Sequence, residues 1–256
     1  MNLGAMELSI LLPAFAAGLL VTATHVPLGT QVLARGIVFI DLAIAQIAGC
    51  GVLVADQLGF EAEGIAVQVA ALAAALAGAL LLTWTERVCP DVQEAVIGVV
   101  FVLAATGGAL LLASNVHGSE HLRDLLVGQI LWVQPARLGW AAAVYVPILA
   151  LWFGWRTRLG RVGFYVLFAC AVTVSVQLVG VYLVFATLIV PPLATRAMAS
   201  PGRMVAAWAL GAAGYAVGLA LSTTLDLPSG PAIVWSLAAL ALAWYSFSRR
   251  AAQASD

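Results

Sequence analysis

Nine stretches of the chain are long runs of apolar residues, and the length of these runs predicts the fold. A helix that crosses about 30 Å of hydrocarbon needs roughly 20 mostly apolar residues. Each run approaches that length and is bounded by charged residues, glycine or proline. They cover residues 7–25, 36–55, 64–83, 95–113, 138–155, 162–178, 179–198, 204–224 and 231–248. The pattern predicts an all-α protein, a polytopic transmembrane helix bundle.

The number of spans depends on the sixth and seventh runs, which form one apolar stretch. Only Ser175, Gln177 and Gly180 interrupt it, so the alternatives are nine spans, or eight with one tilted or re-entrant piece. The longest gap between runs, residues 114–137, has 24 residues and leaves no room for a soluble domain. We therefore expect residues 1–256 to form a single transmembrane domain.

The composition agrees with a membrane protein and excludes several chemistries. Hydrophobic residues make up 63% of the chain and charged residues 9%, and the mean hydropathy is +1.05, whereas soluble domains carry about 25% charged residues. All 11 basic residues are arginine. Without lysine the chain has neither the phosphate-binding lysine of a P-loop nor a Schiff-base amine. A net charge of −1 gives no indication of a nucleic-acid partner.

The arginines predict the orientation, because basic residues are enriched in cytoplasmic connections. With nine spans and the N-terminus outside, nine arginines fall on the cytoplasmic side and only two, Arg123 and Arg137, on the other. Eight crossings would move Arg196 and Arg203 outside, so the arginines favour nine. This orientation places the C-terminus in the cytoplasm.

Two polar residues in the second run are candidates for a metal or substrate path. Asp41 lies six residues after Arg35, which corresponds to roughly 9 Å along a helix. Acids within membrane spans are costly and mark functional sites by default, although a snorkelling or helix-capping Asp41 is the structural alternative. Gln46 lies five residues further, about 140° around the helix, so the two side chains do not share a face.

Two further polar residues are pathway or coupling candidates. Glu94 opens the fourth run, although the helix dipole alone favours an acid in a first turn. Gln177 interrupts the joined sixth and seventh runs, where its side chain could instead satisfy a broken backbone. Pro191 and Pro192 must kink or end the seventh helix, because proline has no amide hydrogen to donate.

The connection HGSEHLRD carries the densest group of metal-binding residue types. His117, Glu120, His121 and Asp124 stand at i, i+3, i+4 and i+7, which on a helix forms one stripe. Imidazoles and carboxylates are ligands for Zn, Mn or Fe(II), and the run fits the H-x-x-E-H protease signature. The alternatives are a metal-capturing site, a catalytic metal site and a solvated helix start.

His25, just before Pro27, is expected at the cytoplasmic interface.

A series of short segments adds a family resemblance. The most recognisable is QLVGVYLVFATLIVPPLATR at 177–196. The others are ELSILLPAFAAGLL (7–20), PLGTQVLARG (27–36), FIDLAIAQ (39–46), EAVIGVVF (94–101), DLLVGQILWVQPARL (124–138) and LDLPSGPAIV (225–234). In this order they resemble the permease subunits of ABC transporters for zinc, manganese and related divalent metals. The resemblance covers almost the entire chain.

The resemblance implies a type II ABC importer permease and its partners. Two copies of the chain would form the pathway as a homodimer in the inner membrane of a bacterial cell. An extracytoplasmic metal-binding protein would deliver the ion, and a separate cytoplasmic ATP-binding subunit would drive transport. The chain itself would then be no enzyme and would hold no permanently bound cofactor. Its cargo would be a divalent metal, zinc or manganese.

The chain departs from the family pattern at two places. The family motif G-D-x-L-x-H, whose Asp and His look like metal ligands, places its Asp on Leu42 and its His on Gln46. A glutamine carbonyl is a harder and weaker ligand than imidazole, so His117 and His121 could coordinate the metal in place of the missing histidine. The usual cytoplasmic helix between the fifth and sixth spans is shortened here to RTRLGR (156–161). Its arginines are the coupling candidates: Arg156, Arg158 and Arg161.

Two other classes of function remain open. An ion-coupled secondary carrier would use Asp41 as its proton or cation site. A membrane metalloenzyme would use the HGSEH motif, and its activity would be lost in Glu120→Gln.

Overall fold

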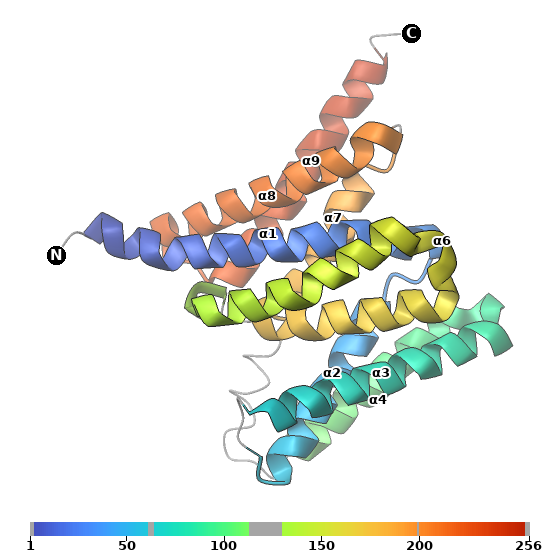
Figure 1. Cartoon of the computed structure of the whole chain (residues 1–256). Helices are drawn as coiled ribbons and strands as arrows, with labels where there is room; N and C mark the ends of the chain where they lie inside the picture. Colours follow the sequence, from blue (N-terminus) through green and yellow to red (C-terminus); the bar gives the residue numbers. More distant parts are fainter. Residues whose placement is uncertain (1–2, 61–63, 113–129, 199, 254–256) are drawn as a thin grey trace. The chain divides into compact units, whose positions relative to one another are not determined.

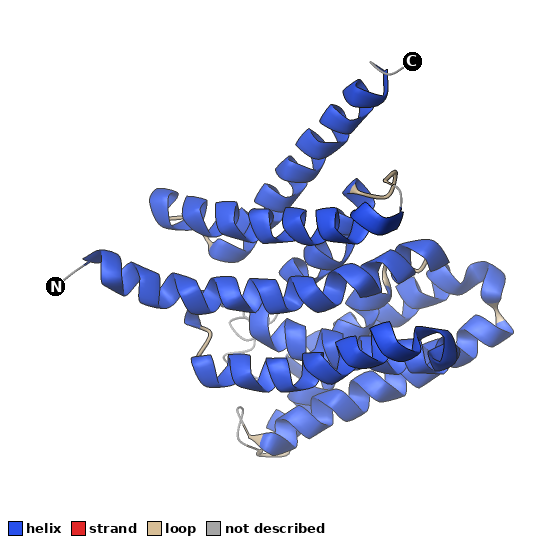
Figure 2. Ribbon diagram, turned by 45° about the horizontal axis from the view of Figure 1, so that its top comes forward, coloured by secondary structure: helices blue, strands red, loops and turns tan. Residues whose placement is uncertain are grey.

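The computed structural model describes residues 3–60, 64–112, 130–198 and 200–253, and within them every regular element is helical (Figure 2). The fold prediction of an all-α helix bundle is confirmed. The elements are α1 (Leu3–Arg35), α2 (Ile40–Gln57), α3 (Ile65–Val88), η1 (Pro90–Val92), α4 (Gln93–Leu112), η2 (Ile130–Trp132), α6 (Pro135–Val179), α7 (Val181–Ala194), α8 (Ser200–Leu225) and α9 (Ser229–Gln253).

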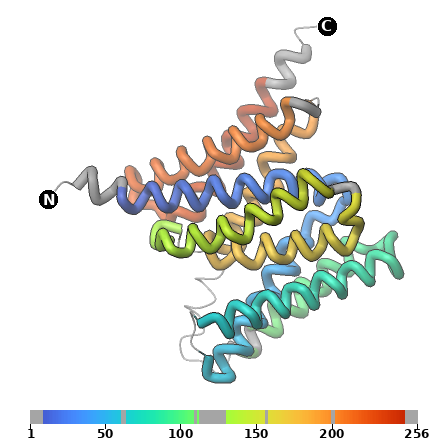
Figure 3. The backbone as a smooth tube through the Cα atoms, in the orientation of Figure 1, coloured from blue at the N-terminus to red at the C-terminus, as the bar shows by residue number. Residues whose placement is uncertain are grey.

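The long element α6 consists of two helical arms. Its backbone leaves helical geometry at Trp155 and at Gly160, where φ is 57°, and the chain reverses direction between the arms (Figure 3). The arms, Pro135–Trp155 and Arg158–Val179, are each long and apolar enough to span a membrane. They correspond to the fifth and sixth runs of the sequence.

Eight of the described helical segments have the length and composition of membrane spans, and α7 does not reach that length. With 14 residues, α7 measures about 21 Å, which is short of a hydrocarbon core of about 30 Å. Gly180, with φ 85°, separates it from α6. The break predicted between the sixth and seventh runs is therefore present, and it leaves a short, largely buried helix.

The first two helices differ from their predicted bounds. Helix α1 continues through Pro27 to Arg35 instead of ending near residue 25, because proline disrupts one backbone bond without preventing helical φ. Helix α2 begins at Ile40, after a turn at Gly36 with φ 69°. Asp41 consequently lies in the first turn of its helix and not about 9 Å into it.

The chain folds as two compact units, and each contains segments distant in sequence. The first comprises the described parts of residues 1–34, 127–142 and 178–256, and the second those of 35–126 and 143–177. That residues 1–256 act as one transmembrane domain stays a prediction.

The first unit contains α1, α7, α8 and α9, and glycines allow its helices to approach closely. Helix α1 runs alongside α8 (Figure 1). A Cβ added at Gly29 of α1 would lie 1.8 Å from the Leu188 carbonyl of α7, and one at Gly218 of α8 would lie 2.4 Å from the Cα atom of Ile233. Small residues permit such backbone contact in lipid. Unit one is therefore tightly packed along α1, α7 and α8.

The second unit contains α2, α3, α4 and most of α6. Gly51 of α2 packs against the Ala70 carbonyl of α3, and the Cys50 thiol donates to the Ala104 carbonyl of α4 at 3.1 Å. Many of the exposed side chains of both units are large and apolar, for example Ile65, Trp140 and Trp235, each more than 70% exposed. These surfaces suit contact with lipid tails.

Candidate carboxylate site

Asp41 is the most unusual side chain of the second unit. It is fully buried, and neither carboxylate oxygen has a hydrogen-bond partner among the described residues. The side chain makes no capping bond at the start of α2, and burial excludes snorkelling. The N-terminal dipole of α2 favours a carboxylate at this position, and a role of Asp41 in a metal or substrate path stays a prediction.

Glu94 comes from α4 to the start of α2. Its Oε1 atom accepts a hydrogen bond from the Phe39 amide at 3.2 Å, and its Oε2 atom is buried without a described partner. Phe39 is the N-cap residue of α2, so Glu94 caps that helix from a different one. This hydrogen bond joins Glu94 to the residue two positions before Asp41, at the same end of α2.

Asp41 and Glu94 both have a buried carboxylate oxygen without a described partner, and the two residues are called the carboxylate pair below. Buried acids without a partner are costly, and the cost falls when a cation or proton joins them. In the parts of the chain that the structure describes, no three His, Cys, Asp or Glu side chains gather as a metal-binding group. A cation or a proton would therefore stabilise the unpartnered oxygen atoms of these two acids.

Gln46 is not part of this pair. It is half-buried on α2, and the unbroken helix Ile40–Gln57 keeps it about 140° from Asp41. Gln177, also half-buried, stands in the last turn of α6, just before the break at Gly180. The nearby Ser175 is the polar group with a visible role, since its hydroxyl bonds to the Ala171 carbonyl and to Tyr145. The role of both glutamines stays a prediction.

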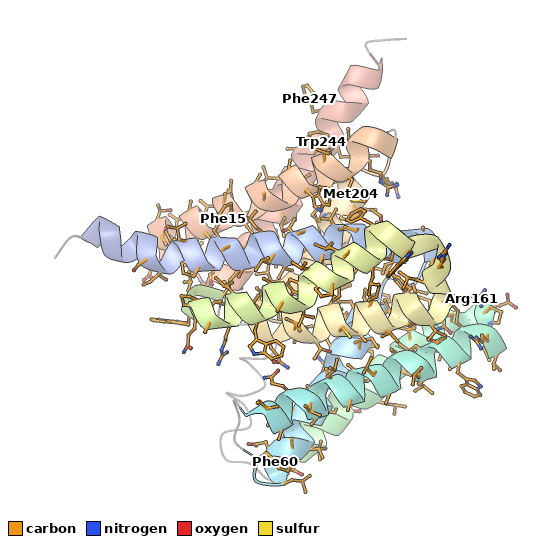
Figure 4. All side chains as sticks on the ribbon, viewed as in Figure 1. Phe15, Phe60, Arg161, Met204, Trp244 and Phe247 are labelled. Atoms are coloured by element: carbon orange, nitrogen blue, oxygen red, sulfur yellow. The ribbon has the colours of Figure 1, made fainter. Side chains whose placement is uncertain are left out.

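The arginines of the turn in α6 have different surroundings. Arg161, labelled in Figure 4, lies 3.9 Å from Glu86 through Nε, and Arg35 lies 3.9 Å from the same Oε1 atom. The Arg35 guanidinium also stacks over the Phe164 ring at 4.4 Å. This cluster ties α3 to the turn between the arms of α6. Arg158 is exposed, and the side chain of Arg156 is outside the described residues.

His117, Glu120, His121 and Asp124 also lie outside the described residues. Their proposed metal chemistry stays a prediction.

Sequence reasoning misplaced one histidine. His25 lies inside α1 and is fully buried, whereas the sequence suggested an interfacial position. Its Nδ1 atom lies 3.1 Å from the Val21 carbonyl and 3.0 Å from the Thr24 hydroxyl, and its Nε2 atom has no partner among the described residues. The polar residues Thr22, Thr24 and His25 within an apolar run could have indicated a buried polar site. Pro27 instead suggested that the helix ended just after His25.

Comparisons with known proteins agree with this architecture. None of the curated proteins compared matches the chain significantly. PsaBC from Streptococcus pneumoniae in complex with Fab has a chain with 20% identity and a TM-score of 0.75, over 92% of this chain and 91% of that one. At this identity the likeness shows the fold.

A second solved structure has the same fold at lower identity. It is an inward-facing conformation of a protein assigned to the metal-chelate type of ABC transporter. It shares 15% identity and a TM-score of 0.68, over 90% of this chain and 83% of that one.

The family model supplies the assignment. The model of the ABC 3 transport family matches residues 7–159 and 147–248, which together take in all eight apolar helices of spanning length. The chain is a multi-pass membrane protein with the fold of an ABC transporter permease, and it belongs to the ABC 3 transport family.

Proposed function

We propose that the chain is the membrane-spanning subunit of an ATP-driven importer of a divalent metal ion, zinc or manganese. The observation that carries the proposal is Asp41, a fully buried carboxylate whose two oxygens have no partner among the described residues. A second acid, Glu94, accepts a hydrogen bond from Phe39 at the start of the same helix. The second similar structure belongs to a transporter of the metal-chelate type, which supports a metal-related cargo. Membership in an ABC family supports the use of ATP.

The small number of ligands in the carboxylate pair suits a cargo ion. Resident structural zinc has about four protein ligands and calcium about six to eight oxygens. A transported ion must be bound firmly enough to enter and weakly enough to leave. Two carboxylates can bind a cation but do not complete its coordination shell. We therefore infer that the metal passes the pair and does not reside there.

The partners follow from what the chain lacks and from where its charges lie. Since the sequence has no lysine, the P-loop must be on a separate ATP-binding subunit. The arginine distribution places that subunit on the side of Arg156, Arg158 and Arg161. An extracytoplasmic metal-binding protein delivers the ion on the opposite side, and a second copy of this chain completes the pathway as a homodimer.

The same distribution orients the carboxylate pair. Asp41 and Glu94 lie in the first turns of α2 and α4, the ends of these helices that follow Arg35 and Arg87. In an inner membrane with the N-terminus outside and the C-terminus in the cytoplasm, this end is cytoplasmic. The pair then lies where an imported ion leaves the membrane. The nine crossings required by this orientation include the short helix α7.

The test is metal uptake by vesicles that contain the purified permease and its ATP-binding subunit. Asp41→Asn should abolish ATP-dependent uptake while the amount of assembled protein stays normal, because asparagine keeps the shape and removes the charge. Asp56→Asn is the matched control, since Asp56 lies in the last turn of the same helix and is only half-buried. Equal uptake by the Asp41 variant and the control would contradict the proposal.

An ion-coupled carrier is the second candidate, because a lone buried acid is also the usual site of a coupled proton. The two candidates differ in their energy source. Uptake that persists without ATP and stops when the ion gradient is collapsed favours the carrier. Uptake that needs ATP hydrolysis and survives collapse of the gradient favours the ABC importer.

A further inference from the structure

His25 lies in the interior of the first unit, far from either end of its helix. Ten residues separate it from Arg35 at the end of α1, which corresponds to about 15 Å along the axis. All residues from Thr24 to Gly29 are buried. A titratable side chain in such a position is expensive, and by default it marks a functional site.

The hydrogen bonds of His25 define which ring nitrogen is available. We assign the proton of the neutral ring to Nδ1, because this atom lies 3.1 Å from the Val21 carbonyl, which can only accept. The Thr24 hydroxyl donates to the Val21 carbonyl at 3.0 Å and can accept from Nδ1 as well. In the neutral ring Nε2 then bears a lone pair, and no donor in the described chain reaches it.

This arrangement is typical of metal-binding histidines. Such a histidine almost always donates its second ring N–H to a carbonyl, carboxylate or water, which fixes the tautomer and turns the other nitrogen toward the metal. In His25 the Val21 carbonyl provides that acceptor. The ring is thus held with its metal-binding nitrogen free.

Helical spacing shows which way this side of α1 faces. Gly18, Thr22, His25 and Gly29 stand at i, i+4, i+7 and i+11, within about 60° of one another around the axis. Three of the four meet α7 or α8: Gly18 packs on the Tyr215 ring, Thr22 on Gly211, and Gly29 on the Leu188 carbonyl. His25, between Thr22 and Gly29 on this stripe, therefore faces the interface of α1 with α7 and α8.

A second polar atom without a partner lies on the same stripe. The Thr22 hydroxyl is buried and, within the described parts of the chain, makes no hydrogen bond. Residues three apart on a helix are neighbours, with Cβ atoms about 5–6 Å apart. An imidazole nitrogen and an oxygen are thus available one turn apart in the same interface. The combination suits a first-row transition metal better than Mg²⁺ or Ca²⁺, which prefer oxygen alone.

We propose that His25 Nε2, together with the Thr22 hydroxyl, forms a metal-contacting site on the interior face of α1 in the first unit. This inference rests on the proposed function for the identity of the ion, a divalent transition metal in transit. The site is separate in chain and in chemistry from the carboxylate pair of the second unit. It gives the pathway an imidazole ligand, which neither Asp41 nor Gln46 supplies.

Binding is measured first, on the purified permease with its ATP-binding subunit. The melting temperature is followed as zinc chloride or manganese chloride is added, because a ligand that binds only the folded state raises it. His25→Gln keeps a polar side chain and removes the imidazole, and it should need at least about tenfold more zinc for the same shift. Thr22→Val should change the zinc requirement in the same direction by less.

The same titration includes a control variant, and it can also give results that overturn the proposal. Thr83→Val removes a buried hydroxyl that bonds only within its own helix, to the Ala79 carbonyl, and should titrate like wild type. A wild-type complex without any metal-dependent shift, or a His25→Gln complex that titrates like wild type, overturns the proposal. If His25→Gln does not assemble, Thr22→Val decides: an unchanged titration overturns the proposal.

Uptake by vesicles is the second readout, and it separates metal contact from packing. His25→Gln should lower zinc uptake more than manganese uptake, because zinc accepts imidazole more readily than manganese does. A purely structural histidine would lower both equally, and that result overturns the inference. A wild type without ATP-dependent uptake contradicts the proposed function, while the titration still decides whether His25 binds metal.

Discussion

The two units each contain a buried polar site, and the sites differ in what offsets the cost of burying their polar atoms. In the second unit, Asp41 and Glu94 are acids that lie in the first turns of α2 and α4, where the helix dipole offsets part of the cost of burying charge. In the first unit, His25 lies in mid-helix but can remain neutral, and the Val21 carbonyl binds its one N–H. The comparison shows two ways in which the cost of burying a polar side chain is lowered in a membrane protein.

The packing around the two sites also differs. Around His25, helix α1 meets α7 and α8 through glycines that leave no space for a Cβ. At the carboxylate pair, α2 and α4 are connected by a hydrogen bond from the amide of Phe39, a half-exposed N-cap residue, to the Glu94 side chain of α4. We therefore expect charge changes to affect transport most in the second unit, and volume changes to affect stability most in the first.

The largest expected effect is the loss of transport in Asp41→Asn. Removing the charge takes away the buried ligand that attracts a cation, so metal uptake should fall to the background of empty vesicles. The thermal stability should stay equal to wild type or rise, because an uncharged amide costs less to bury than a carboxylate. Uptake and melting temperature measured on the same preparation check both parts. A variant that loses stability together with transport would contradict the division between the two units.

The next effect is on stability in the first unit. Gly29→Val should destabilise the protein by about 1–3 kcal/mol or more, because the new side chain collides with the Leu188 carbonyl of α7. Gly49→Ala is the comparison, since nothing lies within 4 Å of a Cβ at that position of α2. Thermal melting of both variants in detergent measures the difference. Equal melting temperatures would refute the close approach of α1 and α7.

Substitution of Glu94 should have a smaller effect on uptake, and two variants separate the contribution of its charge from that of its helix cap. Glu94→Gln keeps an oxygen that can accept from the Phe39 amide, so it should reduce uptake severalfold with little loss of stability. Glu94→Ala also removes the cap of α2, which should cost about 1 kcal/mol more. Uptake and melting curves for the two variants provide the measurement. If both variants transport like wild type, Glu94 is only a helix cap.

The smallest effect is expected from the HGSEH motif. His117→Ala combined with His121→Ala should weaken uptake only at low metal concentration, because a capturing site raises the local supply of the ion without taking part in the crossing. The maximal rate should be unchanged. Uptake curves over a range of metal concentrations test this, and curves that superimpose on wild type would show that the motif has no role in transport.

Much of the fold follows from the length of the apolar runs, because a hydrocarbon core fixes how long a spanning helix must be. Helix ends are predicted less accurately. Pro27 suggests a boundary, yet its φ suits a helix and α1 continues to Arg35. The length of α7 is also hidden in the sequence, since an apolar run of about 20 residues does not reveal that Thr195 ends the helix.

The sequence identifies both members of the carboxylate pair but not that Glu94 reaches the start of α2. Asp41 and Glu94 stand out as acids near apolar runs, whereas the hydrogen bond from Phe39 to Glu94 depends on α4 packing beside α2, across more than 50 residues of chain. His25 is missed for a different reason. Its role depends on burial and on which ring nitrogen is free, and neither is visible until the neighbouring helices are in place.

The most direct test of the account is ATP-dependent uptake of zinc, manganese and iron(II) by vesicles that contain the purified permease with its ATP-binding subunit. We predict saturable uptake of zinc or manganese that needs ATP hydrolysis, is abolished by Asp41→Asn and is preserved in Asp56→Asn. Uptake that is independent of ATP, or that is the same in the Asp41 variant as in wild type, would contradict the claim that the buried carboxylate serves an ATP-driven metal pathway.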